Sequence, residues 1–340
     1  MSLVIHKPGL LTSIQDMGRY GFRKDGVIVS GSMDSFASRT ANLLVGNDPS
    51  AAVLEMTLHG AELQAQRPLL AAICGADMQA CLNGERLPMW TPFVIPEGAE
   101  LQFNYAVSGC RAYLAVAGGL SADQIMGSRS TYLRAGLGGH RGRTLRSGDT
   151  IELVDLHAGM MRVKKLFHQE ETLPAIFGTY AAAKFSAAVS LRPRYTAAPQ
   201  LRFIRSRETS LFTEESWTQL RTSNFRISSQ SDRMGYRLIG DKPLLQNECS
   251  KEMISETVTP GVLQVPPDGQ PILLMADCQT TGGYPRIGQV IAVDLPLAAQ
   301  VKPGEALRFE EVSLRTAQEL LLLQEADLRM LQAGVQARLV

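Results

Sequence analysis

Residues 264–286 combine an apolar run with side chains that could recognise a small amide. A rigid turn at 266–269 leads into five apolar residues at 272–276, and a polar cluster follows at once: Asp277, Gln279, Thr280 and Thr281. Five apolar residues between turn signals predict a strand buried on both faces. The end of such a strand is a rigid place to hold amide, hydroxyl and carboxyl groups. The alternative is a polar turn with no ligand, and the segment alone does not separate the two.

A second candidate is an arginine-rich stretch without acids. Residues 124–148 carry several glycines and five arginines: Arg129, Arg134, Arg141, Arg143 and Arg146. Glycines let backbone N–H groups approach an anion, and guanidinium groups bind phosphate or carboxylate through two parallel hydrogen bonds. The stretch is neither a Walker A loop nor a Gly-x-Gly-x-x-Gly motif. A solvated basic loop that faces a partner's acids is the more frequent meaning of such a charge run.

Two polar turns have both a binding and a structural interpretation. Gln15, Asp16 and Arg19 could line a pocket, but we expect them to tie a terminal strand to the body through side-chain hydrogen bonds. Asp232 could pair with Arg233 or Arg237, either to orient a ligand or to fix the turn between them.

The chain offers little for nucleophilic or paired-carboxylate chemistry. It has no Gly-x-Ser-x-Gly elbow, and no histidine lies within 100 residues of Cys278, so we expect a free core thiol there. If the strand between them is fully extended, Asp268 and Asp277 lie ~30 Å apart. They are not expected to act as a close pair.

Composition excludes several classes of protein. The chain has 340 residues, of which 45% are hydrophobic, and a net charge of +1, so no global field indicates nucleic acid or membrane binding. No apolar run approaches the ~18–20 residues that span a bilayer, and the N-terminus does not resemble a signal peptide. The five cysteines and five histidines show no metal-ligand spacing. We expect a cytoplasmic protein with reduced thiols.

Short strands after glycine turns dominate the pattern. The stretches 98–103, 148–153 and 304–309 each place a glycine before alternating polar and apolar residues, as in a half-buried strand. Further strands are expected at 111–117, 201–205, 236–239 and 288–294. Helices are expected at about 35–45 with Asp34 as N-cap, after Thr213, and from about 313 to 331. This pattern favours a mainly β protein made of barrels or sandwiches.

We expect two halves and a terminal helix. The first half covers 1–155, a connection covers 156–194, and the second half covers 195–312. The helix at 313–340 carries a leucine run, 320–323, with Leu328 and Leu331. We expect this apolar stripe to pack on the body, because it is shorter than the three heptads that a coiled coil needs.

Ordered motifs along residues 5–312 resemble one protein family. They include Pro8-Gly-Leu-Leu-Thr, Gln15-Asp-x-Gly-Arg19, Asn42-x-Leu-Val-Gly-Asn47, Leu54-Glu55, Gly75-Ala-Asp77, Tyr113-Leu-Ala-Val-Ala-Gly-Gly119, Gly127-Ser-Arg-Ser-Thr131, Ser231-Asp-Arg-Met-Gly-Tyr-Arg-Leu238, Val265-Pro-Pro-Asp-Gly-Gln-Pro271 and Gln279-Thr-Thr-Gly-Gly-Tyr-Pro285. The family that these motifs resemble includes the PxpC subunit of bacterial 5-oxoprolinase, the sporulation-related protein KipA, and the second half of the carboxyltransferase domain of urea carboxylase, also called allophanate hydrolase subunit 2.

The resemblance implies a fold, partners and an activity. The fold would be two cyclophilin-like β-barrels. The partners would be a KipI/PxpB-type sister subunit and a LamB/PxpA-type lactam hydrolase, and the complex would convert 5-oxoproline to glutamate with ATP and Mg²⁺. Two alternatives stay open: a KipA-type antagonist of an inhibitor of a sporulation histidine kinase, and half of a biotin-dependent carboxyltransferase. For the latter, the chain itself lacks a Met-Lys-Met-type biotin attachment site.

The site residues are chosen within these motifs by chemistry. ATP could phosphorylate the amide oxygen of the lactam, a step that needs donors for the lactam and cations for the phosphates. Catalytic roles are predicted for Asp232, Arg233 and Gln279. Substrate binding is predicted for Gln264, Asp268, Gln270, Thr280, Thr281 and Tyr284. Anion or ATP binding is predicted for Arg129, Arg141 and Arg143. No metal site is predicted.

Overall fold

The computed structural model describes residues 3–168, 175–177, 180–244, 246 and 253–339, and these divide into two compact units. Unit 1 comprises Met1–Arg19, Asp34–Pro193 and Glu325–Val340. Unit 2 comprises Tyr20–Met33 and Arg194–Gln324. The short segment Tyr20–Met33 therefore belongs to unit 2, although the residues before and after it in the sequence belong to unit 1. Cys249 lies outside the described residues.

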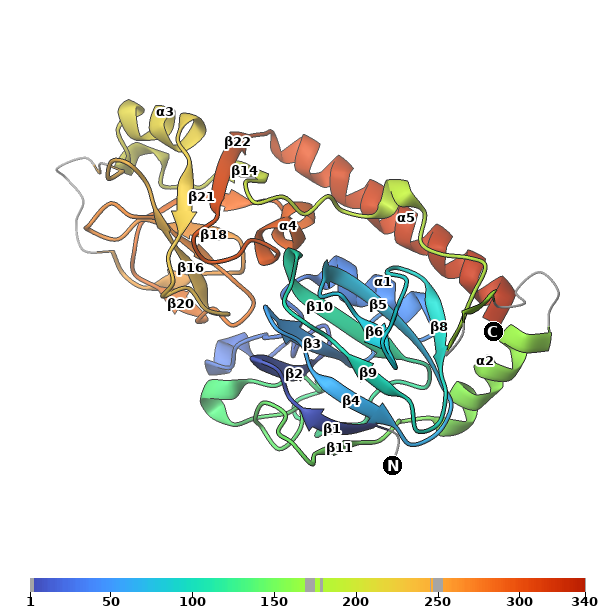
Figure 1. Ribbon diagram of the computed structural model, residues 1–340. Helices are drawn as coiled ribbons and strands as arrows, with labels where there is room; N and C mark the ends of the chain where they lie inside the picture. The colour runs from blue at the N-terminus through green and yellow to red at the C-terminus, as the bar shows by residue number, and fades with distance from the viewer. Residues whose placement is uncertain (1–2, 169–174, 178–179, 245, 247–252, 340) are drawn as a thin grey trace. The chain divides into compact units, whose positions relative to one another are not determined.

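Unit 1 is built on two antiparallel sheets. One has the order β11-β1-β4-β9-β6-β7, with bounds Thr150–Ile151, Leu3–Lys7, Glu62–Ala65, Glu100–Gln102, Cys81–Leu82 and Glu85–Arg86. The other has the order β12-β13-β8-β5-β10-β3-β2, with bounds Ala175–Phe177, Tyr180–Ala182, Pro92–Ile95, Leu69–Asp77, Ser108–Val116, Val53–Thr57 and Leu11–Gln15. Figure 1 shows β5 and β10 side by side at the centre of the second sheet.

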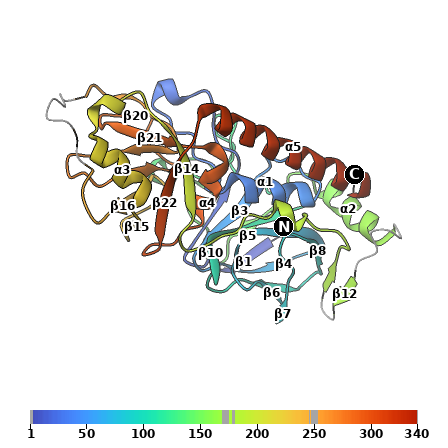
Figure 2. The same cartoon turned by 90° about the horizontal axis from the view of Figure 1, so that it is seen from above.

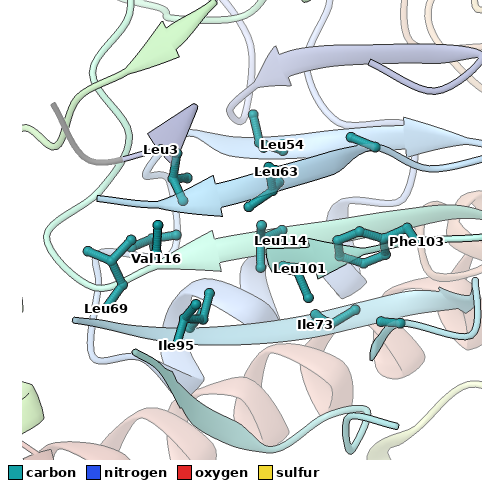
Figure 3. Close-up of a cluster of buried hydrophobic side chains, with 14 of the residues drawn as sticks. Leu3, Leu54, Leu63, Leu69, Ile73, Ile95, Leu101, Phe103, Leu114 and Val116 are labelled. Carbon is teal, nitrogen blue, oxygen red and sulfur yellow. The ribbon is translucent and has the colours of Figure 1, made fainter. Parts of the chain in front are cut away.

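Both sheets of unit 1 contribute side chains to one hydrophobic core. Leu63 and Leu101 come from the first sheet, and Leu54, Ile73 and Leu114 come from the second; all are fully buried (Figure 3). Truncating any one of these leucines or isoleucines to alanine costs about 2–5 kcal/mol. Successive side chains of a strand point to opposite faces, so every second residue of these strands reaches this core.

Helix α1, Ser35–Leu44, covers the second sheet of unit 1 beside β5 and β10 (Figure 2). It begins as predicted, because the Asp34 carboxylate accepts a hydrogen bond from the Ala37 amide at 2.8 Å. The backbone N–H of Asp34 donates in turn to the Tyr113 hydroxyl of β10 at 2.7 Å, which ties the start of the helix to the sheet. Helix α2, Leu156–His168, also contacts β5.

Unit 2 is a closed barrel with strand order β14-β21-β18-β19-β16-β15-β22. The strands span Gln200–Arg205, Arg286–Val290, Val262–Gln264, Ile272–Leu274, Gly235–Ile239, Phe225–Ile227 and Ala306–Glu311. A short ribbon joins β17, Glu256–Thr257, to β20, Thr281–Gly282. Helix α3, Glu214–Thr222, begins after Thr213 as expected, with Thr213 as its N-cap, and α4 spans Leu295–Ala299. Trp217, Phe203 and Phe309 fill the barrel core.

Single helical turns complete the described elements at Arg23–Asp25, Leu133–Ala135, Val189–Leu191, Thr209–Leu211 and Ala292–Asp294. The mainly β fold with few helices is confirmed. So are the glycine turns: Gly98, Gly148 and Gly304 have φ of +76°, +85° and +89° and precede β9, β11 and β22. No described helix has the length and apolar character needed to cross a membrane.

Three expectations need correction. The strand expected at 288–294 ends at Val290, and Ala292–Asp294 forms a single helical turn. The strand predicted at 272–276 ends at Leu274, because the Cys278 amide turns back to the Met275 carbonyl at 3.0 Å. The C-terminal helix α5 spans Leu314–Leu339, but most of its leucine run does not pack: Leu322 and Leu323 are 69% and 63% exposed. Leu328 is buried, and Arg39 of α1 holds Glu325 through two hydrogen bonds within unit 1.

Candidate functional site

The predicted catalytic Arg233 lies in a buried ion pair in unit 2. Its Nε donates to Asp277 Oδ2 at 2.9 Å and its Nη2 donates to Asp277 Oδ1 at 3.0 Å. Nη2 also donates to the Gly31 carbonyl, and the Ser30 hydroxyl donates to Asp277 Oδ1 at 2.8 Å. Arg233 and Asp277 are 7% and 5% exposed, so this guanidinium is committed to holding the segment that contains Ser30 and Gly31.

Asp232 fixes its own turn, which is one of the two roles considered for it, but it does so through backbone amides rather than through Arg233 or Arg237. Its Oδ1 accepts from the backbone N–H groups of Met234 and Gly235 at 2.8 and 3.3 Å. The acid partner of Arg233 is Asp277, which is 44 residues away in the sequence.

The other predicted substrate-binding residues on this side of the barrel divide into two groups. Asp268 and Gln270 support backbone turns: Asp268 Oδ1 accepts from the Gln270 amide at 3.0 Å, and Gln270 Oε1 accepts from the Gly240 amide at 2.8 Å. Gln264 is buried on β18 and its Nε2 lies 3.5 Å from the Tyr284 carbonyl, whereas the Tyr284 side chain is 45% exposed.

The end of the polar cluster is held by backbone bonds. The Thr280 carbonyl accepts from the Val258 amide at 3.1 Å and from Arg23 Nη2 at 3.2 Å. Arg23 belongs to the same Tyr20–Met33 segment as Ser30, so that segment fastens both ends of residues 277–280. Gln279 is half-buried beside this anchor.

A groove of about 980 Å³ opens next to the β17–β20 ribbon and includes Thr281. Its hydroxyl and amide side chains come from four separate segments of unit 2: Ser206, Ser255, Thr257, Thr259, Thr281 and Gln289. These groups can donate to and accept from a neutral polar molecule. The described lining contains no histidine or cysteine, so the groove is suited to binding rather than to nucleophilic attack.

Arg286 forms one wall of this groove and was not predicted as a site residue. Its backbone N–H and its Nε donate to Glu208 Oε2 at 2.8 and 2.9 Å, and its guanidinium also meets Glu256. The hydrogen bonds to the Glu208 carboxylate raise the pKa of Arg286 above its usual value. The charge is therefore neutralised and the wall is rigid. Glu208 lies 78 residues from Arg286, so no local sequence signal could have paired them.

Cys278 is the buried thiol that we expected. It is 1% exposed, and burial raises the pKa of its thiol to about 11. At neutral pH such a group is almost wholly protonated and a poor nucleophile. Among the described residues, no three histidine, cysteine or acidic side chains gather closely enough to hold a metal ion.

In unit 1, the predicted anion residues have different surroundings. Arg143 donates from Nη1 and Nη2 to the two oxygens of Asp149 at 2.7 and 2.8 Å, and His140 Nε2 lies 3.3 Å from the same carboxylate. The hydrogen bonds from Arg143 hold the pKa of Asp149 well below its usual value. Arg141 is exposed, with a φ of +56°.

Arg129 is held in place by its backbone N–H rather than by its side chain. Its N–H donates to Asp16 Oδ2, while Asp16 Oδ1 accepts from Gly18 N at 2.8 Å and from the Ser128 hydroxyl at 2.7 Å. Gln15 Nε2 donates to the Thr131 carbonyl at 3.2 Å. These bonds confirm that the polar turn at residues 15–19 ties the terminal strand to the arginine-rich segment.

Comparisons with known proteins agree with this architecture. The family model described as "Carboxyltransferase domain, subdomain A and B" matches residues 25–311. The chain is 37% identical to the C subunit of 5-oxoprolinase from Escherichia coli over 93% of both chains. It is 36% identical to the Haemophilus influenzae protein of the same name, over 91% of this chain and 90% of that one.

A solved structure of the Kluyveromyces lactis urea amidolyase superposes with a TM-score of 0.84 at 27% identity. The match covers 97% of this chain but only 20% of that much longer one. The chain therefore belongs to the carboxyltransferase-domain family of subdomains A and B, which it shares with the C subunit of bacterial 5-oxoprolinase.

Proposed function

We propose that this chain is the PxpC-type subunit of an ATP-dependent 5-oxoprolinase, acting in the cytoplasm with a KipI/PxpB-type sister subunit and a LamB/PxpA-type lactam hydrolase. The observation that carries the proposal is the 37% identity to the Escherichia coli protein, which extends over 93% of both chains. The reaction would open the ring of 5-oxoproline by adding water across its amide bond, giving glutamate.

The groove of unit 2 supports a role in holding a small amide. A lactam presents one carbonyl acceptor and one N–H donor, and Thr257, Thr281 and Gln289 supply both kinds of partner. Arg286 brings no free charge, since Glu208 and Glu256 neutralise it. The lining also includes Arg205, which pairs with Glu311, and Arg207, so the groove can meet both the amide and the carboxylate of 5-oxoproline.

Two of the cationic residues predicted for the site are already paired within this chain. Arg143 and Arg233, two of the cations expected to meet phosphates, each form a bidentate pair with an aspartate. We therefore propose that ATP is bound by another subunit of the complex.

The test is a reconstituted complex of this chain with its sister subunit and the lactam hydrolase. We expect 5-oxoproline to stimulate ADP release and to yield an equal amount of glutamate. Thr281→Val removes one hydroxyl from the groove at nearly constant volume. If that hydroxyl bonds the lactam, kcat/KM falls about 5–30-fold, the effect of one lost hydrogen bond of ~1–2 kcal/mol.

Thr222→Val is the matched control, because Thr222 is an exposed threonine at the end of α3 and is not part of the groove. A complex that never consumes ATP with 5-oxoproline would contradict the proposed activity. Equal rates for the two variants would be compatible with the proposed activity but would show that the Thr281 hydroxyl of the groove does not contribute to it.

A second candidate is the carboxyltransferase half of a urea carboxylase-like enzyme. It is favoured by the superposition on urea amidolyase and by the family model itself. A separate biotin carrier would have to supply the carboxyl group. Transfer of ¹⁴C from carboxybiotin to an amide in the presence of the chain and its sister subunit would support this candidate; 5-oxoproline-dependent ADP release without biotin would favour the first.

A further inference from the structure

A hollow of about 290 Å³ in unit 1 lies where several distant segments of the sequence meet. Its lining includes residues 47–52 after α1, the turn 118–120 after β10, residues 154–162 at the start of α2, and Arg129. Three of these segments belong to motifs that the sequence singled out and that the unit 2 groove does not use: 42–47, 113–119 and 127–131. Their convergence indicates that the hollow is constructed rather than incidental.

Asn47 organises the hollow from behind. Its Nδ2 donates to the Val116 carbonyl at 2.8 Å, and its Oδ1 accepts from the Gly118 amide at 3.0 Å and from Arg162 Nη1 at 2.8 Å. Gly118 has a φ of +94°, and a Cβ there would overlap the Asp155 carbonyl oxygen. A glycine is therefore required where the turn meets the start of α2.

Arg129 lines this hollow and carries a buried side-chain donor. Its backbone is fixed by Asp16, so its position does not depend on the side chain. Its side-chain Nε is buried, and no residue that the structure describes accepts its hydrogen bond. A buried donor without an acceptor costs about 1–3 kcal/mol. An acceptor bound in the hollow would remove that cost.

Arg162 presents a second guanidinium from α2. It is half-buried, and burial lowers its pKa below the usual value for arginine, an effect that the Asp155 charge only partly opposes. The group still carries its proton at neutral pH, because arginine starts from a pKa above 12. A desolvated cation of this kind is stabilised by an anion that comes close to it.

The two acids of the lining limit which anion can enter. Asp48 Oδ1 accepts from the amide and hydroxyl of Ser50, and Asp155 Oδ1 accepts from the Ala158 amide at 2.9 Å. Both are engaged in turns, and two acids beside two arginines leave the lining without an excess of basic residues. A polyphosphate would be repelled by the two acids, whereas one carboxylate can lie on the arginine side. The volume also lies at the small end of the ~300–1,000 Å³ range of ligand pockets.

We infer that this hollow binds the carboxylate of a small monocarboxylic acid, held between the Arg129 and Arg162 guanidinium groups. Guanidinium groups match a carboxylate through paired N–H donors. The inference concerns unit 1 and does not depend on the reaction proposed for the complex.

The test follows the Arg129 Nε–H signal of the full chain by nuclear magnetic resonance with arginine labelled at ¹⁵Nε. Arg129→Gln identifies the signal. Acetate and 5-oxoproline are the carboxylate probes, 2-pyrrolidinone is the same ring without the carboxylate, and inorganic phosphate and ATP test other anions. Sodium chloride at matched ionic strength controls for screening.

We expect both carboxylates to shift this signal to saturation and 2-pyrrolidinone to leave it in place. Arg162→Gln should weaken carboxylate binding at least ~10-fold, as the loss of a charged hydrogen bond predicts. Arg146→Gln should leave it unchanged, because Arg146 is an exposed arginine of the same segment. Should Arg162→Gln lower stability, Arg162→Lys replaces it and is compared with Arg146→Lys.

The inference is overturned if neither carboxylate gives a saturable shift, if ATP or phosphate binds more tightly than the carboxylates, or if the variants at 146 and 162 weaken binding equally. The result of this binding experiment is independent of whether the complex has the proposed activity. A saturable shift in a chain whose complex does not consume ATP would uphold the carboxylate site and reject the 5-oxoprolinase assignment.

Discussion

The arginines that the sequence predicts as site residues in unit 1 and in unit 2 differ in how they are paired. In unit 2, Arg233 is buried against Asp277, and its donors hold backbone and carboxylate. In unit 1, Arg143 is held in the same way by Asp149, whereas Arg129 keeps a buried donor without an acceptor among the described residues. The residue type indicates a candidate site, but an arginine that is paired with an aspartate of the same chain has no charge left for a ligand.

Removing the acid of the buried pair should have the largest effect. Asp277→Ala leaves the Arg233 charge desolvated and takes away the acceptor of Ser30. We expect a loss of about 3–5 kcal/mol in the free energy of unfolding, measured by urea denaturation.

Asp268→Ala is the control, since Asp268 is exposed and caps only its own turn. Replacing both partners with apolar residues, Arg233→Met with Asp277→Leu, should recover much of the loss. A double variant less stable than Asp277→Ala would show that the pair does more than neutralise itself.

The half-buried pair of unit 1 should matter less and should depend on pH. Arg143 lowers the folded-state pKa of Asp149, so the pair contributes stability above the unfolded pKa of ~3.9 and loses it as pH falls toward the folded value. Arg143→Gln should therefore cost about 1 kcal/mol at pH 7 and progressively less below pH 4. Urea denaturation at both pH values measures the difference; a cost that grew on acidification would contradict this sign.

The smallest effect is expected at Arg141. The side chain is exposed and makes no hydrogen bond or ion pair that the structure describes. Arg141→Gln should change the free energy of unfolding by less than ~0.5 kcal/mol and leave carboxylate binding as it was. A weakening of acetate binding comparable to that of Arg162→Gln would extend the anion site to this loop.

Local signals predicted local structure well. Asp34 and Thr213 indicate their helices because a capping side chain bonds an amide three residues later. The glycines at 98, 148 and 304 indicate strands because their positive φ allows the tight turn before each. Strand length was harder: the apolar run at 272–276 continues past β19, since Met275 and Cys278 are buried in a turn rather than in a strand.

The site depends on pairings that no local pattern encodes. Asp277 was identified as polar and Arg233 as catalytic, yet each is the other's partner across 44 residues. Arg286 was missed because its role follows from Glu208. The hydrogen bond between Arg162 and Asn47 was not predicted either, because these residues are 115 apart in the sequence and meet only where α2 packs beside the turn at Gly118.

The membership of Tyr20–Met33 in unit 2 has a consequence for how the protein is made. This segment leaves the ribosome early, but Arg233, which holds the Gly31 carbonyl, is synthesised 202 residues later. The contiguous stretch Arg194–Gln324 therefore does not contain every segment that the barrel unit needs. A gene fragment that starts at residue 194 would encode a barrel without Ser30, Gly31 and Arg23. Supplying residues 20–33 as a separate peptide should complete it.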